Sequence, residues 1–148
     1  MNKVYFLGPK ENWICDRFAK EWNEDNIDIS VPSPVMADVI WLNASWCWEG
    51  LFKAGLLDNK KIITTVHHIV PEKWNMMAQC EFVMRDQITT VYHVYNQHTL
   101  DFIRPFTKKM IHLLPYWANS RIWCPTTIDH INDVITIKPT KQILKYDE

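Results

Sequence analysis

Glycine is scarce in this chain of 148 residues: only three occur, and none lies in a G-x-G-x-x-G or Walker-type sequence. A glycine-rich phosphate loop therefore cannot form, which argues against a self-contained nucleotide-binding fold. The four cysteines include no C-x-x-C pair and the six histidines no H-x-x-x-H spacing, so we expect no metal site and free thiols. The glycines and cysteines are Gly8, Gly50, Gly55, Cys15, Cys47, Cys80 and Cys124.

The sequence also lacks an excess of positive charge. Its 16 lysines and arginines are balanced by 17 aspartates and glutamates, and the net charge is -1. This balance predicts no nucleic-acid partner. No apolar run is long enough to span a bilayer, and the N-terminal MNKVYFLG has no signal-peptide hydrophobic region. We therefore expect no transmembrane segment and a cytoplasmic protein. The basic pair Lys108 and Lys109 leaves peripheral contact with anionic lipid as an open alternative.

Tryptophan, in contrast, is abundant, with eight residues in a chain that is 47% hydrophobic and 13% aromatic. The composition predicts one well-buried core, and the length is too short for two ordinary domains. We expect some of the indoles to line a binding surface rather than the core.

Short apolar runs alternate with helix-length segments along the chain. Unbroken apolar runs predict buried parallel strands, whereas the alternation of Ile27, Ile29 and Val31 with polar residues predicts an edge strand. The expected fold is α/β, with a Rossmann-like, doubly wound and mostly parallel sheet of about six strands and helices on both faces. The expected strands are residues 4–7, 27–31, 38–42, 62–66, 89–95 and 110–114, and the expected helices are residues 12–22, 71–82, 96–104 and one capped by Ser45.

The stretch from residue 60 to residue 74, KKIITTVHHIVPEKW, is the segment most typical of a functional site. Its β-branched run predicts an interior strand, and His67 and His68 follow at the carboxyl end of that strand. In open α/β sheets the ligand crevice lies outside the carboxyl ends of the strands. These histidines are therefore candidate site residues.

Five stretches, taken together and in order, resemble a known family. They are KVYFLG, DVIWLNAS, IITTVHHIVPEKW, VYHVYNQHTLDFI and LLPYWANSRIW. In them the chain resembles the N-terminal half of a GT-B glycosyltransferase of the retaining, glycogen-synthase-like and mannosyltransferase-like group (glycosyltransferase family 4-like). The similarity covers about residues 3–125. It implies a Rossmann-like GT-B N-terminal domain over residues 1–125 and a tail or interdomain segment over residues 126–148.

The resemblance also implies roles for individual residues. His67 matches a catalytic histidine that reaches the cleft, where it hydrogen-bonds the transferred sugar or stabilises charge as the glycosidic bond opens. Beside it, His68 takes a position that is often acidic or otherwise polar in the family, and the resemblance implies that it binds substrate. The remaining candidates are implied to bind substrate, through hydroxyl contacts or by stacking on a sugar face: Asn43, Ser45, Asn96, Trp46 and Trp74.

The implied function is the acceptor-binding half of a transferase that moves a sugar from a sugar nucleotide to a saccharide or other hydroxyl acceptor. The donor belongs to a second domain, and the chain ends at Glu148, where such a domain is expected to begin. We therefore expect no cofactor bound by this chain alone, and enzymatic activity only together with a donor-binding domain.

Other functions remain open. The main alternative is a non-catalytic carbohydrate-binding or protein-interaction module with the same fold. A flavodoxin-like binder of a small cofactor is disfavoured because no glycine-rich or Ser/Thr-rich loop follows the first strand. Nucleophilic catalysis by a cysteine with a histidine is a further option, because such partners meet in space rather than along the chain.

Overall fold

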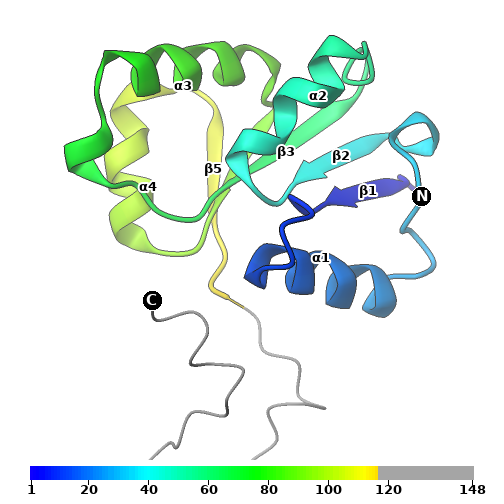
Figure 1. Cartoon of the computed structure of the whole chain (residues 1–148). Coiled ribbons are helices and arrows are strands. Elements are labelled where there is room, and N and C mark those ends of the chain that lie inside the picture. Colours follow the sequence, from blue (N-terminus) through cyan, green and yellow to red (C-terminus); the bar gives the residue numbers. More distant parts are fainter. Residues whose placement is uncertain (117–148) are drawn as a thin grey trace, which may run out of the picture. The chain divides into compact units, whose positions relative to one another are not determined.

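The computed structural model describes residues 1–116 (Figure 1). The expected tail over residues 126–148, the domain boundary at residue 125 and the last part of the LLPYWANSRIW stretch lie outside the described residues. So does Cys124.

Five parallel strands form one sheet in the order β1-β2-β3-β4-β5. The register pairs Leu7 with Leu42, Leu42 with Thr64, and Val66 with Val94, so the carboxyl ends of neighbouring strands meet at one edge. This confirms the predicted α/β class with a parallel, Rossmann-like sheet. The strands are β1 (Val4–Leu7), β2 (Val39–Leu42), β3 (Lys61–Val66), β4 (Val91–Val94) and β5 (Met110–Leu113).

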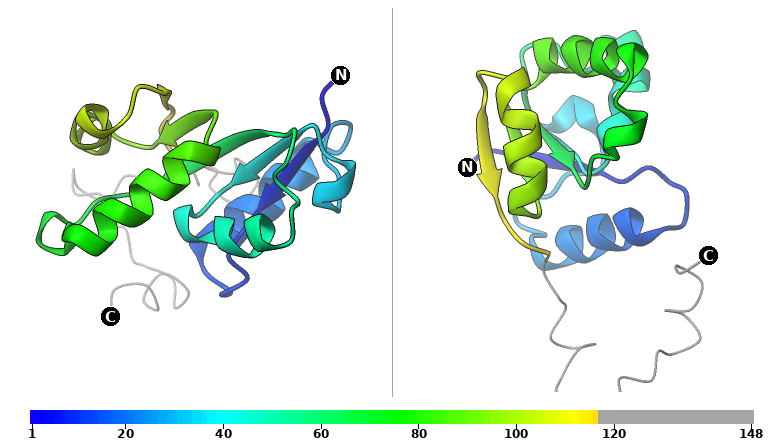
Figure 2. Two further views of the ribbon diagram at one scale, coloured as in Figure 1. Left: turned by 90° about the horizontal axis from the view of Figure 1, so that it is seen from above. Right: turned by 90° about the vertical axis from the view of Figure 1, so that its left-hand side faces the viewer.

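Helices connect the strands, and in Figures 1 and 2 α1 lies on the opposite side of the sheet from α2 and α3. Side-chain contacts agree with this arrangement. Phe6 and Trp41 contact Trp22 of α1, with ring centroids 5.1 and 5.9 Å from that indole, whereas Ile40 clusters with Trp48 of α2. The helices are α1 (Ile14–Asp25), α2 (Trp48–Lys53), α3 (Met76–Ile88) and α4 (Gln97–Ile103). Short 3-10 turns span Pro34–Met36, Ser45–Cys47, Pro71–Lys73 and Arg104–Phe106.

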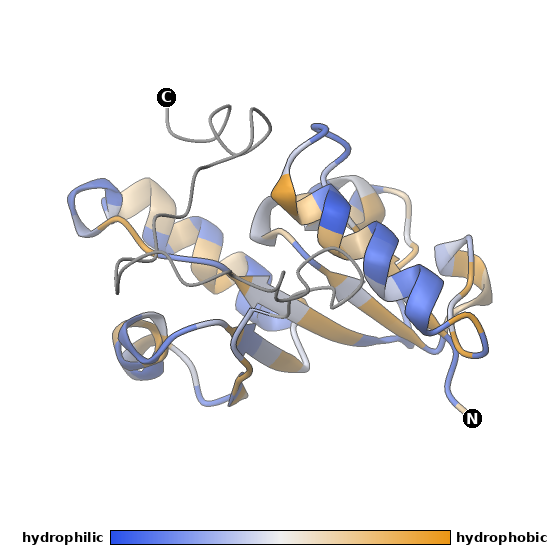
Figure 3. Cartoon of the chain, turned by 90° about the horizontal axis from the view of Figure 1, so that it is seen from below, coloured by the Kyte–Doolittle hydropathy of each residue, from blue (hydrophilic) through white to orange (hydrophobic). Residues whose placement is uncertain are grey.

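Two clusters of apolar side chains fill the space between the sheet and its helices. One surrounds Ile40, Leu42 and Trp48, and the other surrounds Phe82 and Tyr92, whose rings stack at 5.5 Å. Full burial of each large apolar side chain stabilises the fold by about 1.5–3 kcal/mol. The outer surface of α1, in contrast, is hydrophilic (Figure 3).

The predicted edge strand over residues 27–31 is wrong. This segment forms a turn, because the Asn26 carbonyl accepts from the N–H groups of Ile29 and Ser30 at 3.1 and 2.8 Å. Only a single parallel bridge, between Ser30 and Val4, remains of the expected pairing, and Ile27 is 83% exposed. The described residues therefore form five strands rather than six.

Three helix starts test the expected capping residues. Asn96 caps α4 as predicted, since its Oδ1 accepts from the Thr99 N–H at 2.8 Å. The helix expected from Pro71 begins only at Met76, because Asn75 supplies the cap and Pro71 opens a 3-10 turn instead. Ser45 likewise opens a 3-10 turn and caps no α-helix, since α2 begins at Trp48.

No helix among residues 1–116 is long and apolar enough to cross a membrane.

Candidate functional site

His67 is the first residue after β3, at the edge where the carboxyl ends of the strands meet. The side chains around it come from segments far apart in the sequence: Cys15 from α1, Asn43 after β2, Tyr95 after β4 and Tyr116 after β5. We refer to these five residues as the His67 cluster. The parallel sheet brings them together because each segment leaves it at the same edge.

Hydrogen bonds fix which nitrogen of the His67 ring carries the proton. The Nε2 atom lies 2.5 Å from the carbonyl oxygen of Asn43. A carbonyl can only accept, so Nε2 carries the hydrogen and Nδ1 is left as an acceptor. This Nδ1 lies 3.4 Å from the hydroxyl of Tyr116, which can donate to it.

The charge of His67 follows from its burial. Loss of contact with water lowers the pKa of its imidazole from the ordinary value of 6.5, the hydrogen bond to the Asn43 carbonyl opposes this, and the charge of His68 adds to the lowering. At neutral pH the ring is therefore uncharged. It presents a lone pair rather than a second N–H toward Tyr116.

Asn43 supports this arrangement from a fully buried position, with 0% exposure. Its side-chain Nδ2 donates to the Cys15 carbonyl at 2.6 Å, and its Oδ1 accepts from the Tyr95 hydroxyl at 3.3 Å. Its backbone N–H also donates to the Leu7 carbonyl at 2.9 Å. Asn43 thus holds the carbonyl that orients His67, and its side chain is engaged within the protein rather than turned toward a ligand.

Aromatic rings form one wall of the site. Tyr95 is buried, with 4% exposure, and stacks on Tyr116 with centroids 3.8 Å apart and planes 8° from parallel. The His67 ring lies 4.9 Å from Tyr95, and Phe18 lies 5.5 Å from Tyr116. Tyr116 is 52% exposed, so the stack leads from the interior to the surface.

A second imidazole, that of the buried His93 of β4, lies 4.5 Å from Tyr95, with the two rings edge to face. Trp41 Nε1–H donates to Thr65 Oγ1 at 2.9 Å, and Thr65 Oγ1 lies 3.0 Å from His93 Nδ1. Because His93 Nε2 lies 3.1 Å from the Leu114 carbonyl and must donate to it, the Thr65 hydroxyl donates to Nδ1. Burial lowers the pKa of His93, so this ring too is neutral. Both of its ring nitrogens are engaged in hydrogen bonds within the protein.

Cys15 places a thiol next to His67, with Sγ 3.3 Å from Nε2. Burial raises the pKa of the thiol to about 11, and the nearby carboxylates of Asp16 and Glu11 add to the effect. The thiol is therefore protonated at neutral pH, and Nε2 already carries a hydrogen. This pair does not form an activated nucleophile.

The loop between β1 and α1 is closed by a carboxylate of the chain itself. The N–H groups of Lys10 and Glu11 each donate to Asp16 at 2.7 Å, and the N–H of Trp13 lies 3.4 Å from the same carboxylate. A Cβ at Gly8 would collide with the Asp16 side chain, so glycine is needed there. These amides, next to the His67 cluster in the fold, are engaged with Asp16 rather than open to a phosphate.

The other expected site residues lie elsewhere or have other contacts. Trp74 packs on Phe82, Phe102 and Phe106, with ring centroids 5.1–5.6 Å away. Asn96 uses its side chain as the cap of α4, and His68 is exposed beside His67. Of the seven expected residues, only Asn43 and His67 are joined by a hydrogen bond.

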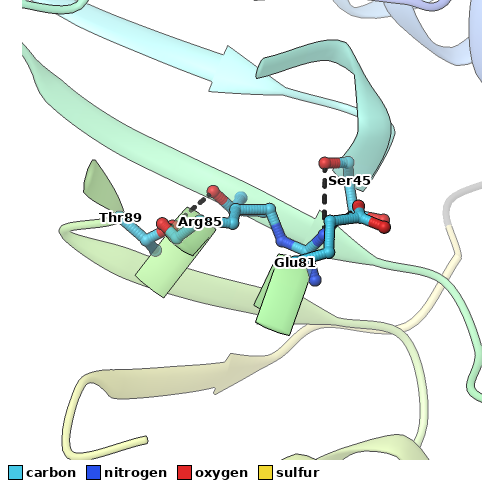
Figure 4. Close-up of polar contacts among 5 residues, drawn as sticks. Ser45, Glu81, Arg85 and Thr89 are labelled. Carbon is cyan, nitrogen blue, oxygen red and sulfur yellow. Dashed lines mark hydrogen bonds and ion pairs between the residues drawn. The ribbon is translucent and has the colours of Figure 1, made fainter. Parts of the chain in front are cut away.

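Ser45 and Trp46 belong to the 3-10 turn after β2. The Ser45 carbonyl lies 3.5 Å from Nη1 of Arg85, a buried residue of α3 that also pairs with Glu81 at 3.1 Å (Figure 4). Arg85 thereby links α3 to this turn. Trp46 is 45% exposed and available to a ligand or partner.

The sequence did not identify Cys15, Tyr95 or Tyr116 as parts of the site. Tyr95 ends the expected strand over residues 89–95, so its position at the carboxyl edge was a usable signal. Tyr116 gave no comparable signal, because its contact with His67 joins residues 49 positions apart.

Among residues 1–116, no group of three or more histidine, cysteine, aspartate and glutamate side chains could hold a metal ion. Comparison with known proteins adds no relative: no family model, no curated protein and no solved structure matches the chain.

Proposed function

We propose that this chain provides the acceptor-binding domain of a GT-B-like glycosyltransferase, with the His67 cluster as the place where a hydroxyl acceptor binds. The sugar-nucleotide donor would be held by a second domain, as the family resemblance implies. The proposal rests on that resemblance together with the chemistry of the cluster.

The observation that carries the proposal is the state of His67. A neutral imidazole, anchored through Nε2–H, offers its Nδ1 lone pair at the carboxyl edge of a parallel sheet. Such a nitrogen can accept a hydrogen bond from an acceptor hydroxyl and can take up its proton as the oxygen attacks the sugar. This role differs from the donor or imidazolium role that the resemblance alone suggested, because the N–H of the ring is already engaged with Asn43.

The proposal includes a doubly wound sheet. Val4 bonds on one side to the segment around Ser30, through its N–H to the Ile29 carbonyl and its carbonyl to the Val31 N–H, while β2 pairs on the other side. The chain would thus run from β1 to the segment around Ser30 on one side of β1, and then cross back to form β2 on the other side. Ligands of open α/β sheets bind at such a switch point, and Asn43 at the end of β2 would border it.

The polarity of the site favours an uncharged ligand. The amides after β1 are engaged with Asp16, and no lysine or arginine belongs to the His67 cluster. Aromatic rings and neutral hydrogen-bonding groups suit hydroxyl-bearing molecules better than phosphates.

Binding of hydroxyl acceptors to the full chain tests this function. We expect a panel of saccharides and other alcohols to contain a ligand whose affinity falls about tenfold when one hydrogen bond is removed in His67→Ala. His98→Ala, an exposed histidine of α4, is the matched control and should leave the affinity unchanged. A ligand that binds both variants equally would contradict the assignment to His67.

A second candidate is a binding module that recognises the same ligands without transferring sugar. The exposed indole of Trp46 and the half-exposed ring of Tyr116 favour it, since both offer faces for stacking. Sugar transfer upon addition of a donor-binding domain would distinguish the transferase from the binding module.

A further inference from the structure

Within the His67 cluster, the side chain of Tyr116 makes the contacts that a bound ligand would make. Its ring lies parallel to Tyr95 at 3.8 Å and within 5.5 Å of Phe18, and its hydroxyl lies 3.4 Å from Nδ1 of His67. The other four residues are more deeply buried. Tyr116, at 52% exposure, covers them from outside.

Tyr116 lies beyond the hydrogen-bonded ladder between β4 and β5. In the described part of the chain, the last backbone hydrogen bond before Tyr116 joins the Leu114 N–H to the Val94 carbonyl at 3.0 Å. Pro115, which follows, has no N–H to donate. Among the described residues, Tyr116 makes its hydrogen bond and ring contacts through its side chain, so rotation of this side chain outward would leave the ladder between β4 and β5 intact.

The hydrogen bond of Tyr116 is also easy to exchange. A separation of 3.4 Å is long for an O–H donor and a ring nitrogen, whose usual distance is nearer to 2.8 Å. Burial and the nearby Cys15 raise the pKa of the Tyr116 hydroxyl, which therefore stays protonated and acts as a donor. Another hydroxyl with better geometry can replace it at Nδ1.

We infer that Tyr116 occupies the acceptor position of the His67 cluster from within the chain, and that the ligand that displaces it is an aromatic alcohol. The space that the Tyr116 side chain fills is bounded by the face of Tyr95, the ring of Phe18 and a hydrogen-bond acceptor. A phenol satisfies all three at once, by stacking on Tyr95 and donating its hydroxyl to Nδ1. This inference rests on the proposed function in taking the ligand to be a hydroxyl acceptor, and it names the class of that acceptor.

The test uses the full chain and the Tyr116→Ala variant, with phenol and p-cresol as probes and thermal shift and NMR titration as readouts. Removal of the side chain is expected to open the position, so Tyr116→Ala should bind the phenols at least about tenfold more tightly than the wild type, since a ligand no longer competes with an internal group. Tyr116→Phe keeps the ring in place and should bind them as weakly as the wild type.

The hydroxyl contact is tested by comparing phenol with toluene, which has similar size and no hydroxyl. In Tyr116→Ala, phenol should bind about tenfold more tightly than toluene, as expected for one hydrogen bond. Adding His67→Ala to this variant should abolish the difference. Equal binding of phenol and toluene in Tyr116→Ala would contradict the role of Nδ1.

Two other outcomes would overturn the inference. Phenols that bind the wild type as tightly as Tyr116→Ala would show that Tyr116 does not occupy the position, and a Tyr116→Ala chain that folds but binds no phenol would show that the position does not fit an aromatic ring. Sugar transfer is measured separately with a donor-binding domain. Phenol binding without transfer would leave the inference standing and contradict the proposed transferase.

Discussion

Replacing Asn43 with alanine is expected to lower the free energy of unfolding by about 3–5 kcal/mol, a large share of the stability of a domain of this size. The side chain is completely buried and bridges the Cys15 carbonyl to the Tyr95 hydroxyl. Alanine removes both bonds, leaves these two groups without that partner and creates a small cavity. Urea unfolding followed by tryptophan fluorescence measures the loss.

Asn96→Ala is the matched control for this experiment. Asn96 also makes a side-chain hydrogen bond, but it is exposed and caps α4, so its loss should cost about 1 kcal/mol. If Asn43→Ala costs no more than Asn96→Ala, the buried bridge does not have the structural importance that its contacts suggest.

Tyr95→Ala is expected to destabilise the protein by about 3–5 kcal/mol, because it removes a large ring from a nearly fully buried position. The ring contacts His67, His93 and Tyr116, with centroids 4.9, 4.5 and 3.8 Å away. Tyr95→Phe keeps these contacts and removes only the hydroxyl that donates to Asn43, so it should cost about 1 kcal/mol.

The comparison of the two Tyr95 variants separates packing from hydrogen bonding. Equal losses in Tyr95→Phe and Tyr95→Ala would contradict the packing role of the ring. Combining Tyr95→Phe with Asn43→Ala gives a further check, since both changes remove the same hydrogen bond. Their effects should be less than additive by about 1 kcal/mol.

Much of the fold could be predicted from the sequence because it depends on local patterns. The β-branched run after Lys60 became β3, and His67 follows it directly, as expected from the end of the apolar stretch. The strand predicted after Asn26 is wrong because the alternating pattern of this segment competes with a turn. In the structure, the Asn26 carbonyl accepts two backbone N–H groups of that segment, and the turn is favoured over the strand.

The candidate site was less predictable because its contacts are not local. The Cys15 thiol meets His67 across 52 positions, and the Asn43 side chain meets Tyr95 across the same separation. No periodic pattern in the sequence predicts such contacts. Nearness in sequence can also mislead. Trp74 is close to the two histidines in sequence, but it packs in an aromatic cluster with Phe82, Phe102 and Phe106.

The pH dependence of stability follows from two imidazoles, the partly buried ring of His67 and the buried ring of His93. Burial lowers the pKa of His67 and of His93 below the ordinary value of 6.5, so the unfolded chain takes up protons at a higher pH than the folded chain does. The contribution of these two neutral rings to the free energy of unfolding is therefore complete above pH 6.5. It is lost as the pH falls toward their pKa values in the folded state.

The measurement that tests the central claim most directly is NMR of the histidine ring nitrogens in the ¹⁵N-labelled full chain, recorded across a pH titration with His67→Ala to assign the signals. We predict that His67 is neutral at pH 7, with the proton on Nε2 and an unprotonated Nδ1, and that it titrates below pH 6.5. A hydroxyl ligand should then shift the Nδ1 signal. An imidazolium at pH 7, or a neutral ring with its proton on Nδ1, would contradict the claim that His67 offers an acceptor at the edge of the sheet.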